Sequence, residues 1–515
     1  MKLFFTVAAL LFYNCVHSQT LTLDPGYASG GVVLTDLSNY GNNDIICHIL
    51  QQSDGKLVAA GETTDEAVSF YKTVLIRYKT DGSIDSSFAG DGILQIEENG
   101  FVYHSAILQD DDKILLMGDK TGDAPDYISN ISVRRIHTDG RTDSSFGTNG
   151  IVLLPSAITG GYGKGIAVLT DGRIIVAGKD AENSSLVVTF GLNSDGTLYP
   201  GFGTDGKRTI DLGFAENGLG CIAVQSDNRI LLGGYFVGAN NQSGFFCLRI
   251  QVNAGTDNSF GSNGLYKTNN SSTNYLELNS IVVTSNDKIL LTGHVGNASG
   301  LSSSVKMIRL LPNGLPDNSF NGSGSADFYK TLSHDSTYVI PNAVAIHPDS
   351  SIFVAGASVN NSGGSSEFII RIRQNGLLDS TLSTEGSGWY YNNQGGLNAV
   401  LNDIVINADS SIFVAGYKES AGTGDDMLIA AYKRLPDIAG TTYVFTGDGS
   451  WTDPLNWLNG SVPPADLPNG AMIVISPQAN GTAILNVEQN ILPGARIVVN
   501  NNAKLEVEGS LKIGN

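Results

Sequence analysis

Short apolar runs separated by turns rich in Asp, Asn and Gly fill most of the chain. Typical runs are "SDGKLVAAG" at 53–61, "TDGRIIVAG" at 170–178 and "SNDKILLTG" at 285–293. In each, an Asp or Asn turn lies between two apolar stretches, which is the pattern of a β-hairpin. The glycine that closes this first motif recurs every 56–63 residues, at Gly61, Gly118, Gly178, Gly234, Gly293, Gly356 and Gly416.

A second motif, such as "TDGSIDSSFAGDG" at 80–92, alternates with the first. Asp stands three residues before its anchor residue in six of seven copies, and Gly stands four residues after the anchor in all seven. We expect this Gly to adopt a backbone conformation that other residues resist. The anchors are Tyr27, Phe88, Phe146, Phe202, Phe260, Phe320 and Leu382.

The two motifs together predict four short strands in each unit. In the second unit these are "SAILQ", "KILLMG", "SVRRIH" and "GIVLL". A period of about 60 residues with four strands per unit is typical of a β-propeller. The seven copies of each motif therefore predict an all-β, seven-bladed β-propeller.

The seventh unit is incomplete, because the pattern stops near residue 436 without a second motif or a fourth strand. The missing part stands at the other end of the chain, as "LDPGYASGGVVL" at 23–34. We expect this N-terminal strand to pair with the last blade and close the ring. Closure removes two exposed sheet edges, which are otherwise sites of aggregation.

The repeats resemble the delta-60 β-propeller repeats of secreted bacterial proteins. The resemblance rests on "DGKLVAAG", "RYKTDGSIDSSFAGDG" and their copies, and the predicted propeller domain is residues 19–436. The resemblance implies export and a propeller, and it implies no defined activity.

The pattern changes from residue 440 onward. The segment "YVFTGDGSWTDPLNWLNGSVPP" at 443–464 resembles the Trp-bearing opening of a β-helical module of large bacterial surface proteins. Short apolar runs follow, so residues 440–515 are predicted to be a small β-solenoid-like module, the truncated start of a longer one. Trp451 and Trp457 are expected to cover the first coil, with stacking on sugar as the alternative.

Residues 1–18 have the features of a signal peptide, with one Lys, an apolar run from Leu3 to Tyr13 and small residues before Gln19. Cys15 leaves a lipoprotein alternative. No later segment is apolar enough to be a transmembrane segment. The 50 acidic and 30 basic residues give a formal charge of -20, which disfavours nucleic acid as a partner. The chain is therefore expected to be extracellular or at the cell surface.

Three cysteines remain in the mature chain, Cys47, Cys221 and Cys247. Cys221 and Cys247 fall in the first and third strands of one blade. One strand lies between them, which puts them about 9–10 Å apart, too far for a disulfide. We expect small buried thiols.

Five arginines precede the anchors at a fixed distance in the third strand. They can be interpreted as an anion site, but we favour ion pairs with the turn Asp of the same blade, because a partly buried Arg needs a carboxylate. In the third blade Gly191 and Tyr199 replace both partners, whereas in the seventh Asp24 stays and Ala431 replaces Arg. The predicted structural pairs are Arg77–Asp85, Arg135–Asp143, Arg249–Asp257, Arg309–Asp317 and Arg371–Asp379.

No sequence motif indicates catalysis, a metal or a cofactor. Turn carboxylates such as Asp81, Asp85 and Asp91 leave calcium open, but turn and capping roles explain them without metal. The histidines have no metal-ligand spacing. Because propeller active sites assemble from distant loops, the lack of a motif does not exclude an enzyme.

Two turn classes repeat closely, whereas the loops at the other ends of the strands vary in length and composition. This difference predicts a scaffold face and a recognition face. The candidate ligand-binding residues on the diverse loops are Tyr103, His104, Tyr162, Tyr235, Phe236 and His294. The favoured function is a non-catalytic, exported scaffold for binding or adhesion to a glycan or protein. The alternatives are a polysaccharide-active enzyme and a purely structural spacer.

Overall fold

A computed structural model describes most of the chain after residue 20. The described residues are 21–37, 43–65, 70–96, 101–121, 129–154, 161–180, 183, 185–238, 242–268, 275–296, 303–329, 338–360, 363–382, 388–391, 398–420, 424–434, 442–458, 462–467, 471–475, 482–492, 495–499 and 504–513. The predicted signal peptide lies outside them. One compact unit comprises Leu23–Asp379 and Trp389–Lys433, and Arg434–Asn515 belongs to the other.

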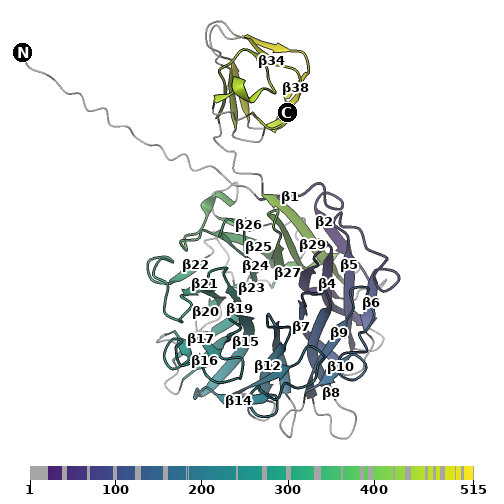
Figure 1. The fold of residues 1–515 in the computed structure, drawn as a ribbon, viewed down its shortest axis with the longest axis vertical. Helices are drawn as coiled ribbons and strands as arrows, with labels where there is room; N and C mark the ends of the chain where they lie inside the picture. The colour runs from purple at the N-terminus through teal and green to yellow at the C-terminus, as the bar shows by residue number, and fades with distance from the viewer. Residues whose placement is uncertain are drawn as a thin grey trace, which may run out of the picture. The chain divides into compact units, whose positions relative to one another are not determined.

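Seven antiparallel sheets form the blades of a β-propeller, arranged in a ring (Figure 1). Blades 1 and 2 contain β3 (Asp44–Gln51), β4 (Leu57–Asp65), β5 (Phe70–Tyr78), β6 (Ile93–Ile96), β7 (Phe101–Leu108), β8 (Ile114–Thr121), β9 (Ser129–Ile136) and β10 (Ile151–Leu153). Blades 3 and 4 contain β11 (Gly161–Val168), β12 (Ile174–Asp180), β13 (Leu186–Leu192), β14 (Lys207–Asp211), β15 (Glu216–Val224), β16 (Ile230–Val237), β17 (Ser243–Ile250) and β18 (Leu265–Lys267).

The other three blades follow the same order. Blades 5 and 6 contain β19 (Tyr275–Val283), β20 (Ile289–Gly296), β21 (Ser303–Leu310), β22 (Ser325–Tyr329), β23 (Tyr338–Ile346), β24 (Ile352–Val359), β25 (Ser365–Ile372), the 3-10 turn η1 (Ser380–Leu382) and β26 (Trp389–Tyr391). Blade 7 contains β27 (Ala399–Ile406), β28 (Ser411–Ser420) and β29 (Gly424–Arg434), with β1 (Leu21–Leu23) and β2 (Val32–Thr35) from the N-terminus. The predicted seven-bladed propeller is confirmed.

The N-terminal segment closes the ring, as predicted. β2 pairs antiparallel with β29, so that Val32 lies opposite Ala430. The N-terminal segment also joins blade 7 to blade 1, because the N–H of Ala28 donates to the carbonyl of Asp81 at 2.8 Å. Equivalent bonds join successive blades further round, from Ala89 to Asp139, Gly147 to Asp195, Gly203 to Asn253, Gly261 to Asn313 and Asn321 to Asn375.

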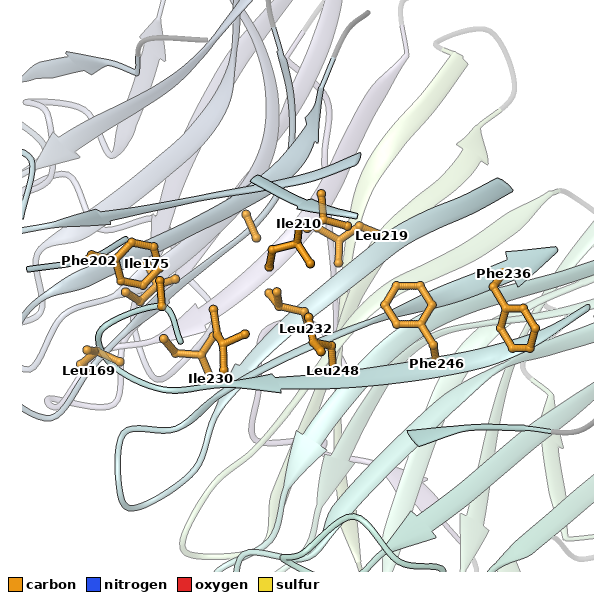
Figure 2. Packing of buried hydrophobic residues seen from close by; sticks show 14 residues of the cluster. Leu169, Ile175, Phe202, Ile210, Leu219, Ile230, Leu232, Phe236, Phe246 and Leu248 are labelled. Atoms are coloured by element: carbon orange, nitrogen blue, oxygen red, sulfur yellow. The ribbon is translucent and has the colours of Figure 1, made fainter. Parts of the chain in front are cut away.

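Alternate residues of the second strands face different neighbours. In β4, Leu57 and Ala59 pack in a cluster with blade 7, whereas Val58 and Ala60 pack with blade 2. Both faces of such a strand are buried, which explains its continuous apolar run. Figure 2 shows one such layer, in which Ile175 and Phe202 of blade 3 lie in one cluster with Leu232 and Phe246 of blade 4.

The second-motif glycines have the backbone conformation expected of them. The six described copies have φ between 80° and 98°, a region that favours glycine. They are Gly31, Gly92, Gly150, Gly206, Gly264 and Gly324. Gly386 of the sixth blade lies outside the described residues.

The C-terminal unit is solenoid-like, with three sheets of parallel strands. The sheets are β30 (Thr442–Phe445) with β33 (Met472–Ile475) and β36 (Arg496–Val499), β31 (Gly449–Ser450) with β34 (Thr482–Leu485) and β37 (Lys504–Val507), and β32 (Asp466–Leu467) with β35 (Glu488–Ile491) and β38 (Ser510–Ile513). A short 3-10 turn, η2 (Pro454–Asn456), precedes Trp457.

Both tryptophans of this unit lie inside it. Trp451 and Trp457 are buried, and their rings meet edge to face at 4.9 Å. The Trp457 indole N–H donates to the Trp451 carbonyl at 2.6 Å, and that of Trp451 to Gln489 Oε1 at 3.2 Å. Buried rings of this kind offer no face to a sugar. Within the described residues no helix is long and apolar enough to cross a membrane.

Candidate functional site

Every innermost strand of the propeller has a β-bulge at the same place. The first strands of successive blades contact one another all round the ring, so they form its inner wall. In each of them the pairing with the second strand shifts by one residue. The extra residues are Cys47, His104, Lys164, Gly220, Asn279, Asn342 and Asn402, and we call them the bulge ring.

The bulge explains the glycine of the first motif. That glycine lies opposite the residue before the bulge, as Gly61 does opposite Ile46. A Cβ on Gly61 would lie 1.9 Å from the carbonyl oxygen of Ile45, and the same clash, at 1.9–2.3 Å, occurs at the other six glycines. No φ in the left-handed region is involved, so the glycine is needed for space. The repeat revealed these glycines, but the cause appears only in the register.

In blades 6 and 7 the bulge residue holds two blades together. The Asn342 amide donates to the carbonyl of Leu401 at 2.8 Å and lies 3.4 Å from the Asn402 amide oxygen. The Asn402 amide donates in turn to the carbonyl of Ile46 at 2.8 Å. Bulge side chains of adjacent blades are therefore neighbours, and Asn at this position has a structural role.

Blades 2 and 3 have ionisable side chains at this position, where three blades have Asn, blade 1 has Cys and blade 4 has Gly. His104 Nε2 lies 2.7 Å from Asp119 Oδ2, and the other Asp119 oxygen accepts the N–H of Gly163 in blade 3 at 2.7 Å. Lys164 follows directly on Gly163. We define the ionisable arc as these bulge residues and their neighbours on the first and second strands: Glu62, His104, Asp119, Lys164, Lys179 and Glu216.

Two lysines of the arc stand on paired strands, and neither has a carboxylate ion-pair partner among the described residues. Lys164 is exposed and Lys179 is half-buried. Burial lowers the pKa of Lys179, the Lys164 charge lowers it further, and Glu216 opposes the effect. No ion pair of either ammonium group is found within the part of the chain that the structure describes. The pair forms a local positive site on a protein whose formal charge is -20.

Carboxylates lie near both ends of the arc. Burial raises the pKa of Glu62, whereas the nearby His104 and the N–H of Tyr103 lower it. At the other end, the Tyr235 hydroxyl lies 3.4 Å from Glu216 Oε1. The His104 side chain is 29% exposed, so a bound molecule can reach its ring. The arc thus combines an imidazole, carboxylates and ammonium groups.

The six candidate ligand-binding residues lie in strands, so their assignment to loops was wrong. Tyr103, Phe236 and His294 are buried, with exposures of 4%, 4% and 1%. Tyr103 and His294 use their polar atoms across blade seams, to His48 Nδ1 at 2.8 Å and to the Tyr338 hydroxyl at 2.6 Å. Phe236 stacks on Phe214 at 4.4 Å. These three do not face a soluble ligand.

The other three candidates remain accessible. Tyr162 is 48% exposed. His104 and Tyr235 are partly exposed, and both belong to or contact the ionisable arc. Sequence reasoning missed Glu62, Asp119, Lys164, Lys179 and Glu216. Part of the site could have been found from the position directly after each first-motif glycine. Three blades have an ionisable residue there, namely Glu62, Asp119 and Lys179.

The structure brings the five predicted Arg–Asp pairs together. The shortest nitrogen–oxygen distances are 2.9, 2.8, 2.9, 2.7 and 3.1 Å for Arg77, Arg135, Arg249, Arg309 and Arg371. Burial alone favours a neutral Asp85, but hydrogen bonds from Ser87 and the Arg77 charge outweigh it and lower the Asp85 pKa to about 2. The arginines are thus ion-paired structural groups.

Four of these arginines also join adjacent blades. The Arg77 guanidinium donates to the carbonyl of Thr138 in blade 2 and lies 5.0 Å from the centroid of its own anchor, Phe88. Arg135, Arg249 and Arg309 repeat both contacts. Arg371 differs, because its anchor is Leu382, and it pairs additionally with Asp349 at 2.9 Å.

Blades 3 and 7 replace the missing arginine in ways that the repeat did not reveal. In blade 3, Arg208 of the fourth strand donates to the Ala254 carbonyl and to Thr256 Oγ1, the latter at 2.7 Å. The Phe202 ring fills the space at Gly191, where a Cβ would lie 2.6 Å from it. In blade 7, Lys433 pairs with Asp24 at 2.8 Å.

The turn carboxylates considered for calcium are engaged in local hydrogen bonds. Asp81 Oδ1 accepts from the N–H and hydroxyl of Ser83 at 2.9 and 2.6 Å, and Asp91 Oδ1 accepts from the N–H of Ile93 at 2.9 Å.

Cys221 and Cys247 are free thiols that lie opposite Gly233 from two sides, so β16 separates them. Burial raises the pKa of both thiols.

Comparison with known proteins supports the fold. A family described as a domain of unknown function (DUF5122) β-propeller matches residues 52–88, 225–260, 284–320 and 347–382. Each match ends at an anchor residue, in blades 1, 4, 5 and 6. No protein with curated annotation matches the chain.

Solved structures also match the chain, at low identity. A protein of unknown function from Dyadobacter fermentans is 11% identical, covers 79% of this chain and 100% of its own, and has a TM-score of 0.40. A PL25 ulvan lyase is 10% identical (79% and 98% covered, TM-score 0.47), and a Hadza microbial sialidase is 10% identical (72% and 73% covered, TM-score 0.37). At these values no activity is carried over, and the family match and the seven blades agree on a β-propeller.

Proposed function

We propose that the chain is an exported, cell-surface or extracellular binding protein whose propeller holds its ligand at the ionisable arc. Its repeats are of the secreted bacterial delta-60 type, and its C-terminal unit is a β-solenoid-like module of the kind found in surface proteins. Binding or adhesion is the task of the propeller, and the inner wall around blades 1–4 is the contact region.

One observation carries this proposal. At positions where blades 6 and 7 use an amide to join neighbouring blades, blades 2 and 3 have His104 and Lys164. A charged or titratable side chain at a bulge, at a position that other blades fill with a structural amide, is expected at a functional site. A purely structural spacer needs no such departure.

The proposal is tested with a glycan and protein binding array on the mature full chain, with and without EDTA. The matched variant is H104N, which gives blade 2 the amide of blades 6 and 7 and should preserve folding. We expect a specific hit that H104N weakens at unchanged melting temperature. Loss of the hit in EDTA would instead indicate a metal in the Asp turns. The absence of any hit would contradict the proposal.

A second candidate is an enzyme acting on polysaccharide, because the His104–Asp119 pair lies near Glu62, whose pKa burial raises. An imidazole and a carboxyl of this kind can serve as general base and acid. The assay is release of reducing or unsaturated ends from a panel of polysaccharides. Turnover that E62Q and H104N abolish would replace the binding proposal with catalysis.

Export is tested separately. We expect the protein outside the cytoplasm, with Gln19 as its first residue by N-terminal sequencing. A protein that retains residues 1–18 and stays in the cytoplasm would contradict export and leave the arc unaffected.

A further inference from the structure

We propose that the ligand is an acidic saccharide, and that Lys164 and Lys179 together bind one carboxylate or sulfate group of it. This inference rests on the proposed function, because it names the ligand of the same site.

The two lysines lie on adjacent, paired strands of blade 3. Lys164 is the bulge residue of β11, and Lys179 lies in β12 directly after Gly178, the glycine opposite that bulge. A bulge redirects a side chain and is common next to binding sites. His104 and Asp119 occupy the same two positions in blade 2 and meet at 2.7 Å, and the Lys164 charge lowers the pKa of Lys179 in agreement with such a placement.

The local charge is unusual for this protein. Several other lysines of the propeller form ion pairs, as Lys306 does with Asp327 at 3.1 Å and Lys433 with Asp24 at 2.8 Å. Two like charges without an ion-pair partner repel each other, and half-burial of Lys179 increases the cost. A bound anion removes this repulsion, and charge-assisted hydrogen bonds from two ammonium groups are strong.

The neighbours of the lysines favour a saccharide. Tyr162 lies directly opposite Lys179 in the β-ladder, so both side chains are on one face of the sheet, and Tyr162 is 48% exposed. An exposed ring beside a cation suits a sugar, whose C–H face stacks while its acidic group meets the charge. Glu216 and His104 can hydrogen-bond hydroxyl groups.

The same neighbours disfavour dense polyanions. Asp119 and Glu216 flank the lysines, and the chain has a formal charge of -20, so a ligand with closely spaced charges meets repulsion on both sides. A saccharide with one acidic group per residue or fewer avoids it. An acidic peptide lacks the flat face that Tyr162 would stack on.

The test measures binding of four probes to the mature full chain: oligogalacturonate, sulfated dextran oligosaccharide, neutral dextran and poly-glutamate. The variants are K164Q/K179Q and Y162A, and the charge-matched control is K79Q/K504Q, which changes exposed lysines elsewhere. We expect one acidic saccharide to bind, roughly tenfold weaker binding or more for each lysine removed, weaker binding for Y162A, and wild-type binding for the control.

The outcomes separate this inference from the proposed function. Equal binding of neutral and acidic saccharides, or an unchanged affinity in K164Q/K179Q while H104N still loses the ligand, overturns the inference and leaves the binding site standing. Preferential binding of poly-glutamate also overturns it. Binding of none of the probes overturns the inference, and the array then decides the proposed function by itself. The galacturonate and sulfated probes identify which acidic group is bound.

Discussion

Replacing Tyr27 by Ala tests whether the N-terminal segment is an integral part of the ring. Tyr27 is 2% exposed and meets Phe413 of blade 7 edge to face at 5.3 Å. On its other side it touches blade 1, where a Cβ on Gly82 would lie 3.1 Å from its ring. Its hydroxyl makes no hydrogen bond within the described residues, so the substitution removes packing only.

Truncation of a fully buried aromatic side chain destabilises a protein by about 3–5 kcal/mol. If residues 21–37 were a loose tail, the same change would stay within about 0.5 kcal/mol. The assay is urea unfolding followed by circular dichroism, with Phe146→Ala as the equivalent seam between blades 2 and 3. The surface control is Tyr329→Ala, whose ring is 67% exposed. A Tyr27→Ala protein that unfolds at the wild-type urea concentration would refute closure.

Three further predictions concern the bulges, the third blade and the last seam. Gly61→Ala places a Cβ 1.9 Å from a carbonyl oxygen and should lower the free energy of unfolding in urea by about 1–3 kcal/mol or more. Gly238→Ala should change it little, because the nearest atom to its Cβ is 3.6 Å away. Equal effects of the two substitutions would contradict the steric role of Gly61. Arg208→Met should lower the free energy of unfolding by about 1–3 kcal/mol, because the buried Ala254 carbonyl loses its hydrogen-bond donor. Arg141→Met should be near neutral, because the Arg141 side chain is 79% exposed. Similar shifts in melting temperature for both variants would contradict the view that Arg208 replaces the missing third-strand arginine. Burial raises the pKa of Asp403 to about 7 from 3.8, against two backbone donors. The folded state therefore keeps a proton that the unfolded state releases, and relative to D403N the wild type should lose up to about 1.4 kcal/mol of unfolding free energy per pH unit between about pH 4 and 7. A constant difference between the two proteins across that range would show that Asp403 titrates normally.

The blade number and the closure were predictable because two motifs recur in phase. The backbone conformation of the second-motif glycines depends only on the turn in which they lie. Their regular spacing is therefore enough to predict the turn. The five Arg–Asp pairs follow from the same logic, since both partners stand at fixed positions in one blade.

The bulges were not predictable from the pattern. A bulge inserts one residue into the alternation of inward and outward side chains, so the first strands read as shorter than they are. β7 begins at Phe101, four residues before the apolar run "SAILQ". For this reason Tyr103 and His104 were assigned to a loop, and Tyr103 is in fact core.

Contacts between blades were also beyond the repeat. In blade 3, Arg208 of the fourth strand takes the place of the missing third-strand Arg. In blade 7, Lys433, two residues after Ala431, pairs with Asp24 instead. Such compensation depends on which groups meet in space. The ionisable arc is of the same kind, because its two ends, Glu62 and Glu216, are more than a hundred residues apart in sequence and belong to one site only through the ring.

The most direct test of the central claim is a titration of H104N/K164N with the best ligand from the array. This variant gives blades 2 and 3 the amide that blades 6 and 7 already have, so its urea unfolding should match the wild type within about 1 kcal/mol. We predict that its affinity falls by roughly a hundredfold or more, since the contacts of one imidazole and one ammonium group are lost. Unchanged affinity in a folded variant would show that the ligand binds elsewhere and that the arc is not the functional site.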